Sequence, residues 1–150
     1  MDRDLNKKEG SLYVGKSENP SGNFVRIPVS LFVDRSLSVL EVLVEYLKEE
    51  MHYTYHEIAV MTNRDDRTIW TVYNRAQKKR LKTSKPVLQK SEVFIPLSVL
   101  LDRALSVLEV LVEYLKEKLH LTYHEIAVLT NRNDRTIWTV YNRGQKKRNK

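Results

Sequence analysis

The sequence of 150 residues has no cysteine, only four glycines and no long apolar run. Without cysteine, neither a disulfide framework nor a thiolate metal site can form. So few glycines leave little room for a glycine-rich phosphate loop. Because nucleophile elbows and paired catalytic carboxylates are also missing, we expect neither an enzyme nor a cofactor. No segment reaches the roughly 18 apolar residues of a membrane span. The charged start MDRDLNKKEG is unlike a signal peptide, so we expect a cytoplasmic protein.

What the chain does have is a hydrophobic content of 41%, enough for a packed core, and a formal net charge of +7. A positive surface favours a polyanionic partner. The basic residues are unevenly placed, because six of them and no acidic residue lie between Arg67 and Lys82, and the same holds between Arg135 and Lys150. A polyanion such as nucleic acid is therefore the first partner to consider.

The chain also repeats itself. Residues 27–66 recur almost verbatim as residues 95–134, with a constant offset of 68 that relates Trp70 to Trp138. This period is longer than the roughly 20–50 residues of solenoid repeats, so the repeat predicts two self-contained small domains. We place these two domains at residues 25–80 and 93–150, the second ending in a basic tail. A flexible arm over 1–24 and a linker over 81–92 complete the chain.

Two capping boxes mark helix starts in each copy. Ser38 is followed three residues later by Glu41, which predicts a helix from about residue 39 to residue 50. Thr54 and Glu57 form the second box and open a helix of about eight residues. Because both boxes recur in the second copy, they predict the same helices there.

The third helix follows after a short turn. Asn63 can adopt the left-handed conformation that ends a helix, and Asp65, which is Asn133 in the second copy, can cap the next one. That helix is expected to begin at Asp66. The segment IPVSLFVDR before the first helix is either a short helix opened by Pro28 or an extended lead-in. The predicted class is all-α, with two near-identical three-helix domains in tandem.

The block HEIAVMTNRDDRTIWTVYNR resembles a helix-turn-helix DNA-binding motif. Its marks are a small residue at Ala59, a turn residue at Asn63, and apolar Ile69 and Val72 facing back. The second copy has the same marks at Ala127, Asn131, Ile137 and Val140. With the preceding helix, each copy is similar to the three-helix domain shared by sigma factor region 4 and many small bacterial and archaeal regulators. The resemblance departs at Asn63, where glycine is usual, and at Arg64, where an apolar residue is common. It implies double-stranded DNA as the partner.

Helical geometry indicates which residues of the third helix can reach a groove. Four residues fall on one stripe and should face the core, namely Ile69, Val72, Tyr73 and Ala76. The opposite side pairs a guanidinium, which can bind guanine, with an amide, which can bind adenine. The predicted base-reading residues are Arg67, Thr71, Asn74, Lys78, Arg135, Thr139, Asn142 and Lys146. The predicted phosphate-binding residues are Arg64, Arg75, Lys79, Arg80, Arg132, Arg143, Lys147 and Arg148.

Three features have simpler interpretations. A basic run at a helix end can merely complement the helix dipole. Trp70 and Trp138 lie at the border of the buried stripe, so we interpret them as packing residues rather than DNA contacts. His52 and His56 have the spacing of a helical zinc pair, but Thr54 caps a helix between them, so no metal site is expected.

The apolar positions of VLEVLVEYLKEE span about 200° of the first helix, more than a three-helix unit usually needs. Either IPVSLF covers the extra surface, or the helix packs against its copy in the same chain or in a second chain. The latter would make an intramolecular pseudo-dimer or a homo-oligomer.

The sequence thus predicts a nucleoid-associated transcriptional regulator that reads two similar half-sites, inverted if the units pack about a two-fold axis. Two alternatives stay open. The first is an architectural protein that coats DNA without sequence preference, and the second is a protein-interaction module.

Overall fold

The computed structural model describes residues 25–86, here called unit 1, and residues 93–149, called unit 2. Each unit has one short strand, one 3-10 helix (η) and three α-helices. Unit 1 contains β1 (Arg26–Pro28), η1 (Val29–Val33), α2 (Val39–Glu49), α3 (Tyr55–Thr62) and α4 (Asp66–Arg80). Unit 2 contains β2 (Phe94–Pro96), η2 (Leu97–Leu101), α5 (Val107–Glu117), α6 (Tyr123–Thr130) and α7 (Asp134–Arg148). The predicted all-α class is confirmed. The predicted arm over 1–24 and the second half of the predicted linker lie outside the described residues.

Both predicted capping boxes are formed. The Glu41 backbone N–H donates to Ser38 Oγ at 3.2 Å, and the Ser38 N–H donates back to Glu41 Oε1 at 2.9 Å. Thr54 and Glu57 make the same reciprocal pair at 3.1 and 2.9 Å. Each box satisfies two N–H groups that a helix start otherwise leaves unpaired. Unit 2 repeats both boxes, so local sequence places these four helix starts.

The turn between α3 and α4 also follows the prediction. Asn63 has φ 56° and ψ 46°, the left-handed conformation that asparagine adopts more readily than other residues with a side chain. Asp65 then caps α4, because its Oδ1 accepts a hydrogen bond from the Thr68 N–H at 2.7 Å. In unit 2, Asn131 has the same left-handed geometry. The asparagine thus occupies the conformation that glycine usually takes in this turn.

The segment before the first helix begins as an extended strand and continues as a short helix. Residues 26–28 form β1, and the 3-10 helix η1 begins directly after Pro28. β1 pairs antiparallel with β2 of the other unit, with Ile27 opposite Ile95, and both side chains are fully buried. The Val29 N–H donates to Val93 O at 2.9 Å, which extends the pairing beyond the strands. A two-stranded ribbon thus joins the units.

The 3-10 helix of each unit also packs against the other unit. η1 of unit 1 packs against α6 of unit 2, and η2 packs against α3. The turn asparagines hold these contacts, because Asn63 Nδ2 donates to Leu101 O at 2.9 Å and Asn131 Nδ2 donates to Val33 O at 3.1 Å. Buried side chains of both units form one hydrophobic core. The boundaries of two self-contained domains stay a prediction, since in the structure each unit covers part of the other.

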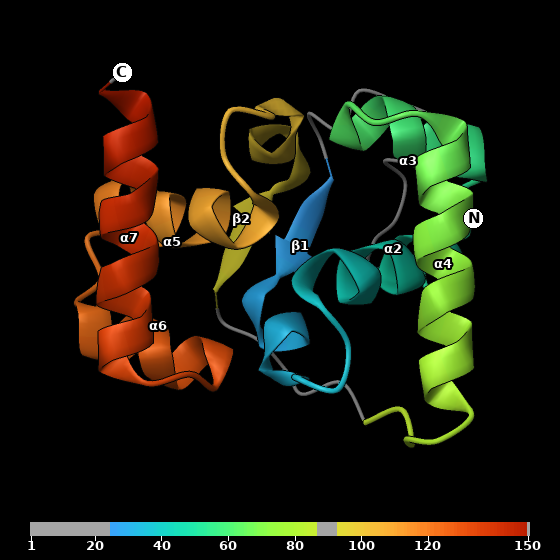
Figure 1. The fold of residues 1–150 in the computed structure, drawn as a ribbon, viewed down its shortest axis with the longest axis horizontal. Helices are drawn as coiled ribbons and strands as arrows, with labels where there is room; N and C mark the ends of the chain where they lie inside the picture. Colours follow the sequence, from blue (N-terminus) through green and yellow to red (C-terminus); the bar gives the residue numbers. More distant parts are fainter. Residues whose placement is uncertain (1–24, 87–92, 150) are drawn as a thin grey trace, which may run out of the picture.

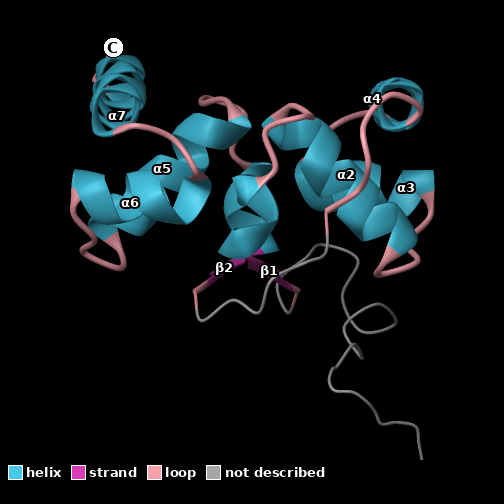
Figure 2. Ribbon diagram, turned by 90° about the horizontal axis from the view of Figure 1, so that it is seen from below, coloured by secondary structure: helices cyan, strands magenta, loops and turns pink. Residues whose placement is uncertain are grey.

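The excess apolar surface of the first helix is covered in both ways that the sequence allowed. η1 packs on α2, and α2 also contacts α5 across the approximate two-fold relation between the units. This relation sets the overall shape. In Figure 1, α4 runs down one side and α7 runs up the other, so the two helices are antiparallel. Figure 2 shows both on the same face of the molecule, opposite the β1–β2 ribbon.

Candidate nucleic-acid interface

The outward side of α4 carries the predicted base-reading residues Arg67, Thr71, Asn74 and Lys78, which we call the reading face. Arg67, Thr71 and Lys78 are exposed, and none of their side chains makes a hydrogen bond or ion pair within the described residues. On the opposite stripe, Ile69, Val72 and Ala76 are buried, as predicted. Tyr73 of the same stripe is only half-buried, because its hydroxyl reaches out to donate to Glu49 Oε2 at 2.7 Å. The reading face of α7 has the same exposure and consists of Arg135, Thr139, Asn142 and Lys146. The buried stripe of α7 consists of Ile137, Val140 and Gly144. Two cationic side chains per helix therefore face outward without an ion-pair partner among the described residues.

Asn74 is half-buried, and its amide is partly used. Its Nδ2 donates to the backbone carbonyl of Trp70 at 2.7 Å, one helical turn earlier. Asn142 makes the same bond to Trp138 at 2.8 Å. An asparagine amide has two N–H donors and an acceptor oxygen, so one donor and the oxygen remain for a base edge. The bond also fixes the orientation of the amide.

Trp70 and Trp138 differ from the sequence interpretation. The two residues are 54% and 53% exposed, so they do not pack in the core. The reason is angular, because Trp70 follows Ile69 by 100° of helix rotation and thus leaves the buried stripe. Thr71 and Asn74 lie one and four residues further on, so the indole borders the reading face. A large apolar ring exposed at the same place in both units is a surface feature that sequence reasoning missed.

The basic residues at the end of α4 meet acidic residues of α2. Lys79 Nζ lies 2.7 Å from Glu41 Oε1, and the Glu41 side chain is only 3% exposed. Burial raises the pKa of Glu41, but the hydrogen bonds from Lys79 and from the Ser38 N–H outweigh it and hold the pKa below its usual value. Lys147 and Glu109 repeat the pair at 2.7 Å. These lysines therefore neutralise buried carboxylates.

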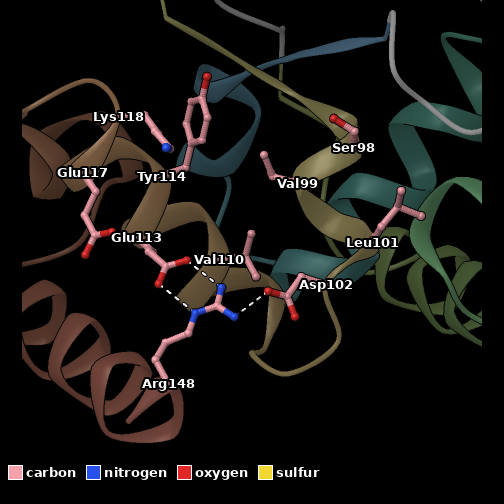
Figure 3. A pocket seen from close by; sticks show the side chains of 10 residues that line it. All are labelled: Ser98, Val99, Leu101, Asp102, Val110, Glu113, Tyr114, Glu117, Lys118 and Arg148. Atoms are coloured by element: carbon pink, nitrogen blue, oxygen red, sulfur yellow. Dashed lines mark hydrogen bonds and ion pairs between the residues drawn. The ribbon is translucent and has the colours of Figure 1, made fainter.

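Arg80 is held more firmly still. Its Nη2 lies 2.8 Å from both Asp34 Oδ2 and Glu45 Oε1, and its side chain is 12% exposed. The hydrogen bonds that Arg80 donates to Glu45 raise the pKa of Arg80 above its usual value. In unit 2, Arg148 contacts Asp102 and Glu113 at 2.6 and 2.7 Å (Figure 3). Both arginines clamp the end of the third helix to the rest of the unit.

Arg64 and Arg132 also have intramolecular partners. Arg64 Nη1 donates to the carbonyl of Thr62 at 2.7 Å, at the end of α3. Arg132 donates to the equivalent carbonyl of Thr130 and also to Phe32 O of the other unit at 3.1 Å. Burial lowers the pKa of both guanidinium groups. The two departures from the helix-turn-helix pattern, Asn63 and Arg64, thus have a structural explanation in helix ends and inter-unit contacts.

Arg75 and Arg143 are the most available of the predicted phosphate-binding residues. Both side chains are largely exposed, and their closest carboxylates, in Glu41 and Glu109, are 4.0 and 3.9 Å away. Phosphate binding by all eight predicted residues stays a prediction. For Lys79, Arg80 and their copies, any such contact competes with an ion pair, whereas for Arg75 and Arg143 the competition is weak.

The start of α4 carries two acidic residues, of which one is paired. His56 Nδ1 of α3 lies 3.1 Å from Asp66 Oδ1, and His124 and Asp134 repeat this contact. Asp65 caps the helix and has no ion-pair partner within the described residues. Over residues 25–86 and 93–149, no group of three metal-ligating side chains comes together.

Comparison with known proteins finds no matching family model, no matching curated protein and no matching solved structure. In the described part of the chain, no helix combines the length and the apolar character that crossing a membrane requires.

Proposed function

We propose that the chain binds double-stranded DNA, with α4 and α7 each reading one half-site in the major groove. The supporting observation is that the two helices are antiparallel (Figure 1) and lie on one face (Figure 2), and each presents an exposed arginine, threonine and lysine at matching positions. Such a protein would act as a site-specific regulator of transcription.

The antiparallel arrangement favours inverted half-sites. Two inverted half-sites on DNA are related by a two-fold axis, and dimeric helix-turn-helix proteins match this axis with their own symmetry. α4 and α7 are related in the same way within a single chain (Figure 1). Direct repeats would instead need two helices that run parallel.

The chemistry of the reading face fits a groove floor. Arg67 can donate two hydrogen bonds to guanine, and the free donor and acceptor of Asn74 suit adenine. The exposed ring of Trp70 can contact a thymine methyl or a sugar, as apolar side chains do in major grooves. These groups distinguish bases, which a protein that only coats DNA does not require.

The ion pairs argue against a coating protein. Coating depends on many cations that are free to bind phosphates. Lys79 and Arg80 instead hold buried carboxylates of α2, and Lys147 does the same with Glu109 of α5. Arg148 holds the partly exposed carboxylate of Glu113. The cations of the reading face hold no carboxylate, and Arg75 lies 4.0 Å from its nearest one, so these groups stay available to DNA.

A charge-matched pair of variants tests which face binds. Arg135→Ala removes a charge from the reading face of α7, and Arg26→Ala removes one from β1 on the opposite face. We measure binding of each full chain to a fluorescent mixed-sequence duplex over a range of salt concentrations. Arg135→Ala should weaken binding, while Arg26→Ala should leave it unchanged at every salt concentration.

The same variants test base reading. Against a site selected from a random pool, Arg135→Ala should in addition lower discrimination from mixed sequence by about 1–3 kcal/mol. Equal losses from Arg135→Ala and Arg26→Ala would contradict the assigned face, and no binding of the parent chain to any duplex would contradict DNA binding. Binding with the expected face but no discrimination would identify the coating protein instead.

A further inference from the structure

The reading faces of the two units are identical, but the residues that cap the two helices differ. α4 is capped by Asp65 and α7 by Asn133. Each side-chain oxygen accepts a hydrogen bond from the backbone N–H three residues on, in both cases at 2.7 Å. The backbone angles also agree, with φ −92° and ψ 160° for Asp65 and φ −95° and ψ 160° for Asn133. Aspartate and asparagine cap helices about equally well. The exchange therefore alters charge and leaves the local structure unchanged.

The charge of Asp65 is present at neutral pH. The hydrogen bond from the Thr68 N–H lowers the pKa of Asp65 below its usual value, and Arg103 and Arg67 lower it further through their positive charge. Asp65 therefore lies within electrostatic range of Arg67, a residue of the reading face. In unit 2 the corresponding neighbour of Arg135 is a neutral amide. The positive potential at the start of α7 is accordingly stronger than that at the start of α4.

The second acidic residue of each helix start does not remove this difference. Asp66 and Asp134 are present in both units, and each pairs with a histidine at 3.1 Å. Asp65 has no such partner within the described residues. A helix N-terminus ordinarily attracts phosphate groups, because its free N–H groups and dipole are positive. An unpaired carboxylate at that point offsets the attraction in unit 1 alone.

We propose that unit 2 is the primary DNA anchor and that Asp65 weakens the hold of unit 1 on its half-site. This inference rests on the proposed DNA binding. In this inference Asp65, which lies outside the reading face, makes the affinity of unit 1 for a half-site lower than that of unit 2. The chain would engage a single half-site through α7 and add α4 only when an inverted second half-site is present.

A duplex with one half-site tests this, because either unit can bind it and the parent chain will choose the stronger. The probe is a duplex that carries one copy of the half-site enriched from a random pool. If unit 2 binds about two- to fivefold more tightly than unit 1, as expected for one charge near a helix end, Arg135→Ala should weaken binding about three- to sixfold. Arg67→Ala should then weaken it less than about twofold.

Exchange of the caps provides the matched control. In the Asp65→Asn background, the Arg67→Ala and Arg135→Ala changes should each cost about twofold, because the units become equivalent. In the chain with both Asp65→Asn and Asn133→Asp, the order of the two effects should reverse. Raising the salt concentration should shrink all these differences, which a purely structural effect of the caps would not produce. Thermal unfolding verifies that each variant is folded.

Equal losses from Arg67→Ala and Arg135→Ala in the parent chain would overturn the inference while leaving DNA binding intact. An unequal loss that persists after the cap exchange would also overturn it, because the asymmetry would then arise elsewhere. Failure of the parent chain to bind any duplex would contradict the proposed function itself, so the two failures are distinguishable.

Discussion

Unit 1 has a buried tyrosine, Tyr53, just before α3, and unit 2 has Leu121 at the same position. The hydroxyl group of Tyr53 is buried and has no hydrogen-bond partner among the described residues. Burial raises the pKa of this hydroxyl to about 12. The reading faces, in contrast, contain the same four residues in both units. Leu121 is only half-buried. The comparison teaches that this position accepts a change of shape, polarity and burial, while the surface we assign to DNA is the same in both units.

A second comparison concerns how deeply the same ion pair is buried. Arg80 is 12% exposed and Arg148 is 33% exposed, although both contact two carboxylates. Arg80 also donates to Ser36 Oγ at 3.2 Å and to Ser84 O at 3.4 Å. Unit 2 has Ala104 in place of Ser36. The residues that follow α4 thus close over its end, which makes the clamp of unit 1 the more buried of the two.

Weakening the ribbon is expected to have the largest effect, because the ribbon is part of the core that both units share. Ile27→Ala should lower the free energy of unfolding by about 2–5 kcal/mol, since the side chain is fully buried opposite Ile95. Both units should unfold in one transition. Each unit has one tryptophan, so each can be followed alone during urea unfolding of Ile27→Ala. An added Trp138→Phe change leaves Trp70 to report on unit 1, and an added Trp70→Phe change leaves Trp138 to report on unit 2.

Coincident midpoints are the expected result for both reporters. The exposed Val33 supplies the control, because Val33→Ala should change stability by no more than about 0.5 kcal/mol. If Ile27→Ala unfolds unit 1 and leaves unit 2 at the parent midpoint, then the units are self-contained, as the sequence alone predicts.

Removing the clamp arginines should sharpen the difference between the units. Arg80→Ala leaves Asp34 and Glu45 without their cation in a nearly buried site, which should cost about 3 kcal/mol. Arg148→Ala acts at a more exposed pair and should cost about 1 kcal/mol. Urea denaturation of the two variants measures both values. An equal cost would show that burial does not set the strength of these pairs.

The smallest expected effect comes from exchanging the helix residues Ala76 and Gly144. Both are buried at the same position of the third helix. A Cβ added at Gly144 would lie 3.6 Å from Leu105 Cδ1, an ordinary contact. Gly144→Ala should therefore stabilise the chain by about 0.5–1 kcal/mol, and Ala76→Gly should destabilise it by a similar amount. Thermal unfolding compares the two, and destabilisation by Gly144→Ala would mean that α7 packs too tightly for a methyl group.

The helices were largely predictable because their signals are local. Ser38 with Glu41, Thr54 with Glu57 and the cap at Asp65 each act within one helical turn, and all are confirmed. The ribbon was not predictable in the same way. Three residues around Ile27 pair with three residues 68 positions further on, and so short a strand has no periodic pattern of its own. Its pairing depends on how the whole chain packs.

The candidate site was predictable in part. The buried stripe under α4 follows from helical periodicity, so the exposure of Arg67 and Lys78 was expected. The partners of Lys79 and Arg80 lie on α2, and only the packing angle of α2 against α4 decides which carboxylate each basic residue meets. The sequence did contain a signal for these ion pairs. Glu41 and Glu45, both buried, are spaced four residues apart and so share one side of α2.

Selection from a random DNA pool tests the central claim most directly. The purified full chain is bound to the pool at moderate salt, and the retained duplexes are sequenced after several rounds. Because α4 and α7 are antiparallel and have the same reading face, the account predicts an enriched motif made of two similar half-sites in inverted orientation. Enrichment of direct repeats, or a pool that stays unenriched although it binds, would contradict the account.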